Sequence, residues 1–176
     1  KMLRMIERIS DITGRLLDFS KKRLPQFKNE EVNAILDKAV AIVANRFLIE
    51  NKEIIKQYTK NLPQIKADSH QLQQAFINLA INALQSLEER GSLFIITSNM
   101  SQIKHVKITF KDNGCGISRE DLKKIFDPFF TTKQGGSGLG LTIVRQIIKQ
   151  HGGTVEIKSV LGKGTRVDIF LPSVLK

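Results

Sequence analysis

The clearest hydrophobic pattern along this chain lies between Asp68 and Leu87, where apolar side chains recur at the spacing of a helix. At about 100° per residue, one arc of that helix holds Leu72, Phe76, Leu79, Ala83 and Leu87. Asp68 or Ser69 stands at the N-cap position. The polar face carries only amides, namely Gln71, Gln74, Asn78, Asn82 and Gln85. The pattern therefore predicts a helix of about five turns with one apolar face and one uncharged polar face.

A polar helix face without Lys, Arg, Asp or Glu is unusual for a surface that meets bulk water. One interpretation is a buried helix with an amide-rich interface. The other is a ligand site that needs neutral oxygen donors, such as a magnesium ion already bound to phosphates. The amide pattern by itself leaves both interpretations open.

Periodic stretches on either side of this helix predict the rest of the fold. Further helices are expected at 33–50 and 140–151, and strands at 53–59, 64–66, 92–100, 103–111, 154–160 and 165–171. A Gly162-Lys163-Gly164 turn joins the last two strands. This order favours an α+β fold, a two-layer α/β sandwich whose mixed, mostly antiparallel sheet is faced by helices.

The first 22 residues form a separate pattern, a heptad-like seam of apolar residues. Its members are Met2, Met5, Ile9, Ile12, Leu16 and Phe19. The seam predicts a helix that either joins a coiled coil or packs on the rest of the chain. Pro25 ends this helix, and a linker is expected to continue to about Glu30. We therefore divide the chain into a helix and linker at 1–28 and a main domain at 29–176.

Composition narrows the function classes. The 176 residues are 41% hydrophobic and carry a net charge of +11. Basic residues are interleaved with acidic ones, so an anionic ligand or an acidic protein partner is favoured and no nucleic acid is expected. No apolar run reaches the ~18 residues of a membrane span. Cys115 is the single cysteine, which fits a reducing compartment, and we expect a cytoplasmic domain whose parent protein is either free or membrane-anchored.

Three glycine- or phenylalanine-rich segments carry the candidate chemistry. Asp112-Asn113-Gly114-Cys115-Gly116-Ile117 follows a predicted strand, where Asp112 would be a buried acceptor and two glycines would let backbone approach a flat ring. The second segment is Phe126-Asp127-Pro128-Phe129-Phe130-Thr131-Thr132-Lys133. In the third, Gly135-Gly136-Ser137-Gly138-Leu139-Gly140 opens a helix, as phosphate sites do. Taken singly, these segments also fit an ordinary turn, a hydrophobic plug and a flexible loop.

The order of these segments is more specific than any one of them. Asn78-x-x-x-Asn82, Asp112-x-Gly114-x-Gly116, Phe126-x-Pro128-Phe129-Phe130, Gly136-x-Gly138-x-Gly140 and Gly164-Thr165 follow one another. Together they resemble the ATP-binding catalytic domain of bacterial sensor histidine kinases, over about residues 30–172. The motifs are similar to that family's N box, first glycine box, F box, second glycine box and closing Gly-Thr. Asn-Ala-Leu-Gln-Ser with Phe-Phe-Thr-Thr-Lys most resembles the nitrogen-regulation branch.

The resemblance implies a Bergerat-type ATP-binding fold, with ATP and Mg²⁺ as cofactors. Asn78 and Asn82 would be the magnesium-side residues, and Asp112 would read adenine. The segment 131–137 would be a short ATP lid. Gln85 stands where many members carry a basic residue, and Lys133 could substitute for it. The implied ATP-binding residues are Asn78, Asn82, Gln85, Asp112, Gly114, Gly116, Ile117, Phe126, Thr131, Thr132, Lys133, Gly136, Ser137, Gly138, Leu139, Gly140, Leu141 and Thr165.

The resemblance also implies the reaction. In the wider ATPase superfamily a Glu four residues before the metal-binding Asn activates water, and here that place is Asn78. An amide accepts no proton at neutral pH, which favours a kinase over a hydrolase. The family's phosphoacceptor is a histidine on a helical dimerisation hairpin, and none of His70, His105 and His151 has its sequence context.

We therefore expect a truncated histidine kinase, with residues 1–22 as the second helix of the dimerisation hairpin and no catalytic phosphoacceptor in the chain. Its implied partners are the dimerisation domain of the same kinase, a response-regulator receiver domain, and a second copy in a full-length homodimer. Two alternatives remain open: a serine/threonine kinase of the anti-sigma type, and a nucleotide-binding module without transfer activity.

Overall fold

The computed structural model describes residues 24–133 and 136–174 of the chain, so the N-terminal helix expected at 1–22 lies outside the described residues. Helices cover 32–49, 69–86, 119–122 and 140–150, with a 3-10 turn at 101–103. In order, the elements are β1 (Lys28–Glu30), α2 (Val32–Ile49), β2 (Glu53–Gln57), β3 (Ile65–Ala67), α3 (Ser69–Ser86), β4 (Ser92–Met100), η1 (Ser101–Ile103), β5 (His105–Asp112), α4 (Arg119–Leu122), α5 (Gly140–Gln150), β6 (Thr154–Val160) and β7 (Gly164–Pro172).

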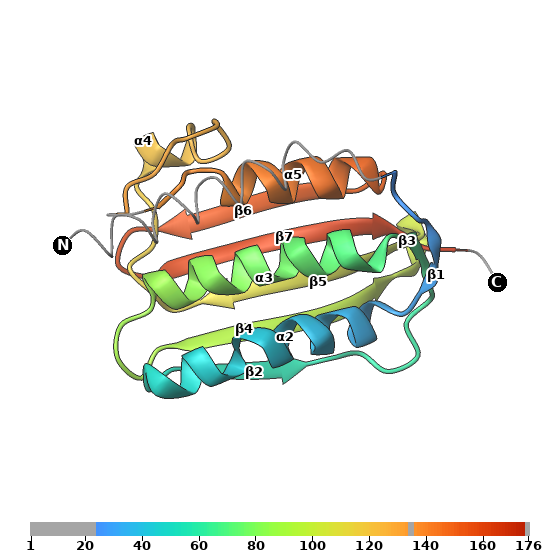
Figure 1. Cartoon of the computed structure of the whole chain (residues 1–176), viewed down its shortest axis with the longest axis horizontal. Helices are drawn as coiled ribbons and strands as arrows, with labels where there is room; N and C mark the ends of the chain where they lie inside the picture. The colour runs from blue at the N-terminus through green and yellow to red at the C-terminus, as the bar shows by residue number, and fades with distance from the viewer. Residues whose placement is uncertain (1–23, 134–135, 175–176) are drawn as a thin grey trace.

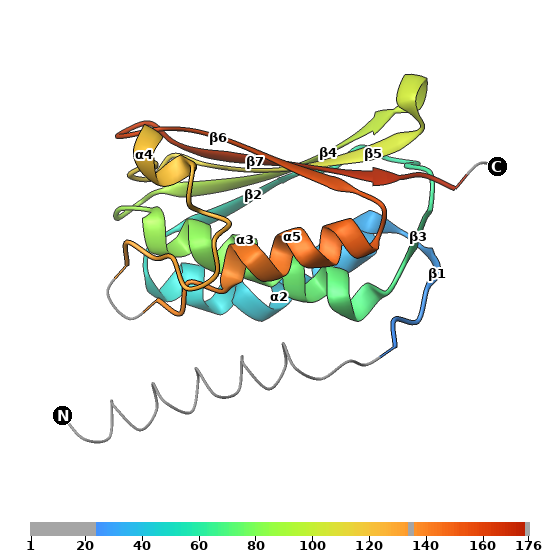
Figure 2. The same ribbon diagram turned by 90° about the horizontal axis from the view of Figure 1, so that it is seen from above.

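The main sheet has the strand order β2-β4-β5-β7-β6. Strands β2 and β4 are parallel, and the other three pairings are antiparallel. Helices α2, α3 and α5 lie side by side on one face of this sheet (Figures 1 and 2). This arrangement confirms the predicted α+β fold with a mixed, mostly antiparallel sheet faced by helices.

The helix predicted from the amide and apolar faces is α3, the central helix of the layer (Figure 1). Asp68 caps its N-terminus, because the carboxylate accepts hydrogen bonds from the backbone N–H groups of His70 and Gln71. Leu72 and Phe76 are fully buried against the sheet, as the helical periodicity requires. The polar face of α3 points away from this core.

One expectation about the start of the domain was wrong. Residues 28–30 were assigned to a linker, but they form β1, which pairs antiparallel with β3. Gln26 also donates its backbone N–H to the Asp68 carboxylate at 2.8 Å, and the Phe27 ring contacts His151 edge to face. Residues 28–30 are all polar and show no strand-like alternation, so only their pairing with β3 reveals this strand.

No helix within the described parts of the chain is long and apolar enough to cross a membrane.

Candidate functional site

A cavity of about 520 Å³ lies at one edge of the helix layer, lined by residues of several elements. The C-terminal end of α3 and the N-terminal end of α5 point toward this edge (Figure 1), and the end of β5 and the start of β7 contribute further lining residues. We call the part lined by Phe110, Asp112, Gly116, Ile157, Thr165 and Val167 the strand side. The helix side is lined by Arg46, Asn78, Asn82, Gln85, Lys133, Gly138 and Gly140.

Asp112 is the central polar group of the strand side. It is the last residue of β5, and only 8% of its surface is exposed. Its Oδ1 accepts backbone hydrogen bonds from Gly114 at 2.9 Å and Thr165 at 3.2 Å. Burial raises the pKa of this carboxyl, although the two backbone donors oppose the rise. Both backbone bonds end on Oδ1, so Oδ2 receives no backbone hydrogen bond from the described residues.

The glycines beside Asp112 serve the packing of the strand side. Gly116 has φ +69°, and a Cβ placed on it would lie 2.1 Å from the Val160 carbonyl oxygen. A Cβ on Gly114 would lie 2.3 Å from the Ser86 carbonyl oxygen. We expected these glycines to open the backbone to a ligand. The structure adds a packing reason, since backbone of the same chain occupies the space that a Cβ would take. The approach of a flat ring to this backbone stays a prediction.

The helix side is organised around Asn82 and the start of α5. A Cβ on Gly140 would lie 3.8 Å from both Asn82 amide atoms, so that side chain faces the helix N-terminus. No side chain among the described residues caps α5. Gly138 has φ +67° and packs against the Phe129 backbone, whose N–H donates to the Gly138 carbonyl. The uncapped N–H groups make this end of α5 suited to an anion.

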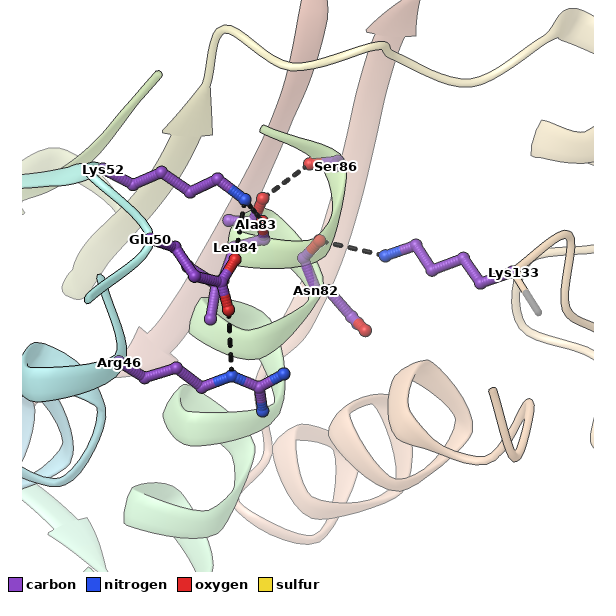
Figure 3. A network of polar contacts seen from close by, with 8 residues as sticks. All are labelled: Arg46, Glu50, Lys52, Asn82, Ala83, Leu84, Ser86 and Lys133. Atoms are coloured by element: carbon purple, nitrogen blue, oxygen red, sulfur yellow. Dashed lines mark hydrogen bonds and ion pairs between the residues drawn. The ribbon is translucent and has the colours of Figure 1, made fainter. Parts of the chain in front are cut away.

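Lys133 joins the loop that follows Phe130 to α3. Its ammonium donates to the Asn82 carbonyl at 3.0 Å and to Gln85 Oε1 at 3.2 Å. Figure 3 shows the lysine reaching across to the last turns of α3. Burial lowers the pKa of Lys133, while Cys115 and Asp112 act in the opposite sense. The positive charge of Lys133 therefore lies beside Gln85, the position at which many members of the resembling family carry a basic residue.

Two further cations surround the C-terminal end of α3 (Figure 3). Lys52 donates to the Leu84 carbonyl at 2.8 Å and pairs with Glu50 at 2.9 Å. Arg46 pairs with the same carboxylate at 3.3 Å and also lines the cavity. Cations at the last carbonyls of a helix satisfy unpaired acceptors and oppose the negative end of its dipole.

Most of the predicted site residues line this one cavity. They are Asn78, Asn82, Gln85, Asp112, Gly116, Ile117, Thr131, Thr132, Lys133, Gly136, Ser137, Gly138, Gly140, Leu141 and Thr165. Gly114, Phe126 and Leu139 are outside the lining. Gly114 packs on Ser86, and Leu139 is buried before α5. The Phe126 carbonyl accepts the Thr142 hydroxyl at 3.2 Å, and its ring lies under Arg145.

The sequence analysis missed several lining residues, among them Phe110, Val167 and Arg46. Phe110 and Val167 each stand two positions from a predicted site residue on the same strand face, so strand alternation offered a signal for them. Arg46 had none. It belongs to α2, which contains no motif, and only the packing of α2 against α3 brings it to the cavity.

The family model of the histidine kinase-, DNA gyrase B-, and HSP90-like ATPases matches residues 67–175, and the chain belongs to this family. Among curated relatives, the signal transduction histidine-protein kinase AtoS of Escherichia coli (strain K12) is 36% identical over 171 residues. That alignment covers 97% of this chain and 28% of AtoS. The chain spans between 28% and 37% of the length of the first curated relatives it matches.

Solved structures give the same family. The catalytic domain of histidine kinase ThkA is 28% identical, with a TM-score of 0.76, over 84% of this chain and 96% of that domain. A ThkA structure in complex with the response regulator protein TrrA matches 98% of this chain and 49% of that chain, with 26% identity and a TM-score of 0.81. Both structures are of the histidine kinase ThkA, and AtoS is also named a histidine-protein kinase.

Proposed function

We propose that this domain binds Mg-ATP and transfers its γ-phosphate to a histidine on a dimerisation domain, for onward transfer to a response regulator. One observation carries the proposal: a single cavity unites the paired asparagines of α3, the buried Asp112, the lid segment and the uncapped N-terminus of α5. Membership of the ATPase family and the kinase relatives support the same reaction class. The assignment to the nitrogen-regulation branch stays a prediction from the residues of the motifs.

The proposed orientation follows from the chemistry of the two sides. Asp112 Oδ2 would accept the exocyclic amine of adenine, which is a hydrogen-bond donor. Apolar side chains of the strand side would face the ring. At the other end, the backbone N–H groups after Gly138 would bind phosphate oxygens, supported by the dipole of α5. Lys133 would offset phosphate charge from the lid.

The protein side chains in the cavity would bind Mg²⁺ only together with the phosphates of a nucleotide. The described residues hold no cluster of three or more His, Cys, Asp and Glu side chains that could bind a metal ion by themselves. The side-chain oxygen of Asn82, and that of Asn78 one turn earlier, are hard neutral donors on the same helix face. Magnesium keeps water and phosphate ligands and takes few ligands from protein, so two amides suffice. The bound ion would neutralise part of the phosphate charge.

The residues that line the cavity bear on which group receives the γ-phosphate. Asn78 provides no proton acceptor for water, and none of the described lining residues is a histidine. His151 is engaged elsewhere: Asp68 donates its N–H to Nε2 at 3.0 Å, and Nδ1 lies 2.8 Å from the Ile147 carbonyl. An external histidine in line with the γ-phosphate is therefore the proposed acceptor, with positioning and charge stabilisation supplying the catalysis.

The test is phosphate transfer from radiolabelled ATP. The domain is incubated with a separate polypeptide that carries a dimerisation hairpin of this kinase class and its histidine. We expect acid-labile, alkali-stable label on the hairpin, since a phosphohistidine N–P bond hydrolyses in acid. Asn82→Ala should lose most of the magnesium dependence of ATP binding while its unfolding curve stays that of wild type. The same magnesium dependence in variant and wild type would remove Asn82 from the metal site.

Two other outcomes would redirect the proposal. Acid-stable label on a serine or threonine would indicate a kinase of the anti-sigma type. ATP binding without label on any supplied hairpin would indicate a nucleotide-binding module.

A further inference from the structure

Among the described residues that line the cavity, only Arg46 and Lys133 are basic, and only Asp112 and Asp121 are acidic. Lys133 comes from the lid segment and hydrogen-bonds to the end of α3. Arg46 comes from α2 and belongs to none of the motifs of the sequence analysis. Arg46 is therefore a positive charge in the proposed triphosphate site that no motif accounts for.

The packing of the three helices places Arg46 opposite the phosphate-binding helix terminus. Helices α2 and α3 run in the same direction, and α3 lies between α2 and α5 (Figure 1). The C-terminal ends of α2 and α3 and the N-terminal end of α5 point toward the same edge of the layer. Gly140 starts α5 on one flank of α3, and Arg46 reaches the cavity from the other. Asn82 stands between them and faces Gly140.

The guanidinium group of Arg46 is largely free to act. Its side chain is 56% exposed, and only Nε is used, in the 3.3 Å contact with Glu50. Its two terminal nitrogens make no hydrogen bond to any residue that the structure describes. Figure 3 shows the group lying against the face of α3 that carries Asn82. Terminal guanidinium nitrogens are paired donors that match two phosphate oxygens.

The ion pair between Arg46 and Glu50 can be exchanged at low cost. Both side chains are exposed enough that their pairing contributes little to stability. Glu50 keeps a second partner, since the Lys52 ammonium lies 2.9 Å from its other oxygen. Release of Arg46 therefore leaves no carboxylate without a counter-ion.

We propose that Arg46 binds the terminal phosphate of ATP and makes the domain select ATP over ADP. This inference rests on the proposed function. A phosphate chain that starts at the N-terminus of α5 and crosses Asn82 ends on the α2 flank of α3, where Arg46 lies. The terminal phosphate carries roughly −1.5 to −2 charge at neutral pH. Besides Lys133, Arg46 is the remaining basic residue among the described residues that line the cavity. ADP lacks this group and does not reach the arginine.

The experiment compares calorimetric titrations of the domain with Mg-ATP and Mg-ADP. Arg46→Ala and Arg46→Gln should each weaken Mg-ATP binding roughly tenfold and Mg-ADP binding less than about twofold, because a charge-assisted phosphate contact is lost. Arg46→Lys should fall between wild type and alanine, since it keeps the charge and loses the paired donors. Lys38→Ala is the matched control: it removes a charge from an exposed position of α2 outside the cavity, and both affinities should stay at wild type.

The possible failures are distinguishable. If Arg46→Ala and Arg46→Gln change ATP and ADP affinity by the same factor, or change neither, the inference is overturned while the proposed function stands. If the wild-type domain binds no Mg-ATP, the proposed function itself fails. The circular dichroism spectrum of each variant must match wild type, and Arg46→Gln retains most of the side-chain stem for that purpose.

Discussion

The strand side and the helix side of the cavity hold their polar groups in different ways. On the strand side, Asp112 is fixed by two backbone donors and by the pairing of β5 with β7. On the helix side, the charges of Arg46 and Lys133 are carried by long side chains. Lys133 also lies in the segment that the proposed function assigns to the ATP lid. Under the proposed function, the strand side would recognise the adenine ring, and the helix side would respond to the number of phosphates.

The glycines show the same contrast. At Gly116 and Gly164 the φ angle is positive, and a Cβ would lie 2.1 Å and 2.0 Å from a backbone oxygen. At Gly140 a Cβ would meet only the Asn82 amide, at an ordinary 3.8 Å. The strand side is therefore close-packed backbone. On the helix side, Gly138 is packed as tightly, with φ +67° and the Phe129 carbonyl oxygen 2.5 Å from a Cβ placed on it, so the open space lies beside Gly140.

The largest expected effect is a difference in stability between a glycine substitution on the strand side and one on the helix side. Gly116→Ala should lower the free energy of unfolding by roughly 2–4 kcal/mol, from left-handed backbone strain and steric overlap. Gly140→Ala should stay within about 0.5 kcal/mol of wild type. Urea denaturation of both variants measures this. Equal stability losses would mean that the surroundings of Gly140 are packed as tightly as those of Gly116.

The next effect tests the strand side alone. Asp112→Asn should weaken Mg-ATP binding by roughly 1–3 kcal/mol, because the amide can present a donor to the adenine amine. The variant should not lose stability at neutral pH. Burial raises the pKa of Asp112, so the ionised form costs stability above that pKa, and the cost disappears as pH falls through it.

Isothermal calorimetry with ATP checks this prediction. Asp121→Asn is the matched control, since Asp121 also lines the cavity but accepts hydrogen bonds from neither Gly114 nor Thr165. Its ATP affinity should stay within about twofold of wild type, the range of an ordinary surface substitution. An Asp112→Asn variant that binds ATP as wild type does would refute the adenine assignment.

The smallest effect concerns pH and the helix side. Burial lowers the pKa of Lys133 from its ordinary value of 10.5, and a nearby phosphate would favour the protonated form. Mg-ATP binding should therefore weaken as the pH rises through the range just below 10.5, where the free domain loses this proton. Lys133→Gln should bind ATP up to about fivefold more weakly at neutral pH and lose this alkaline dependence.

Titrations over a pH series provide the measurement, with Lys124→Gln as the control. Lys124 is exposed and lies outside the cavity, so its removal should leave the pH profile of wild type. If Mg-ATP binding by Lys133→Gln still weakens at alkaline pH as wild type does, the group that loses its proton is not Lys133.

Local sequence patterns predicted the longer helices and strands well, because buried and exposed positions alternate there with a regular period. The helix expected over 68–87 is α3 at 69–86, and Asp112 ends β5 as a buried acceptor. Two features of the fold and site had no local pattern to predict them. Strand β1 has three residues, and its existence depends on pairing with β3 more than thirty residues away. Arg46 looks like any charged residue on a solvated helix.

By itself, the sequence determined the amphipathic faces, the caps and the ordered motifs, because periodicity and backbone preferences act over a few neighbouring residues. The tertiary structure alone decided that β2 lies parallel to β4, that β7 inserts between β5 and β6, and that Lys133 meets Gln85. It also decided that α2 carries Arg46 to the cavity. These contacts join segments distant in the chain, and their energy comes from a shared core that no local pattern specifies.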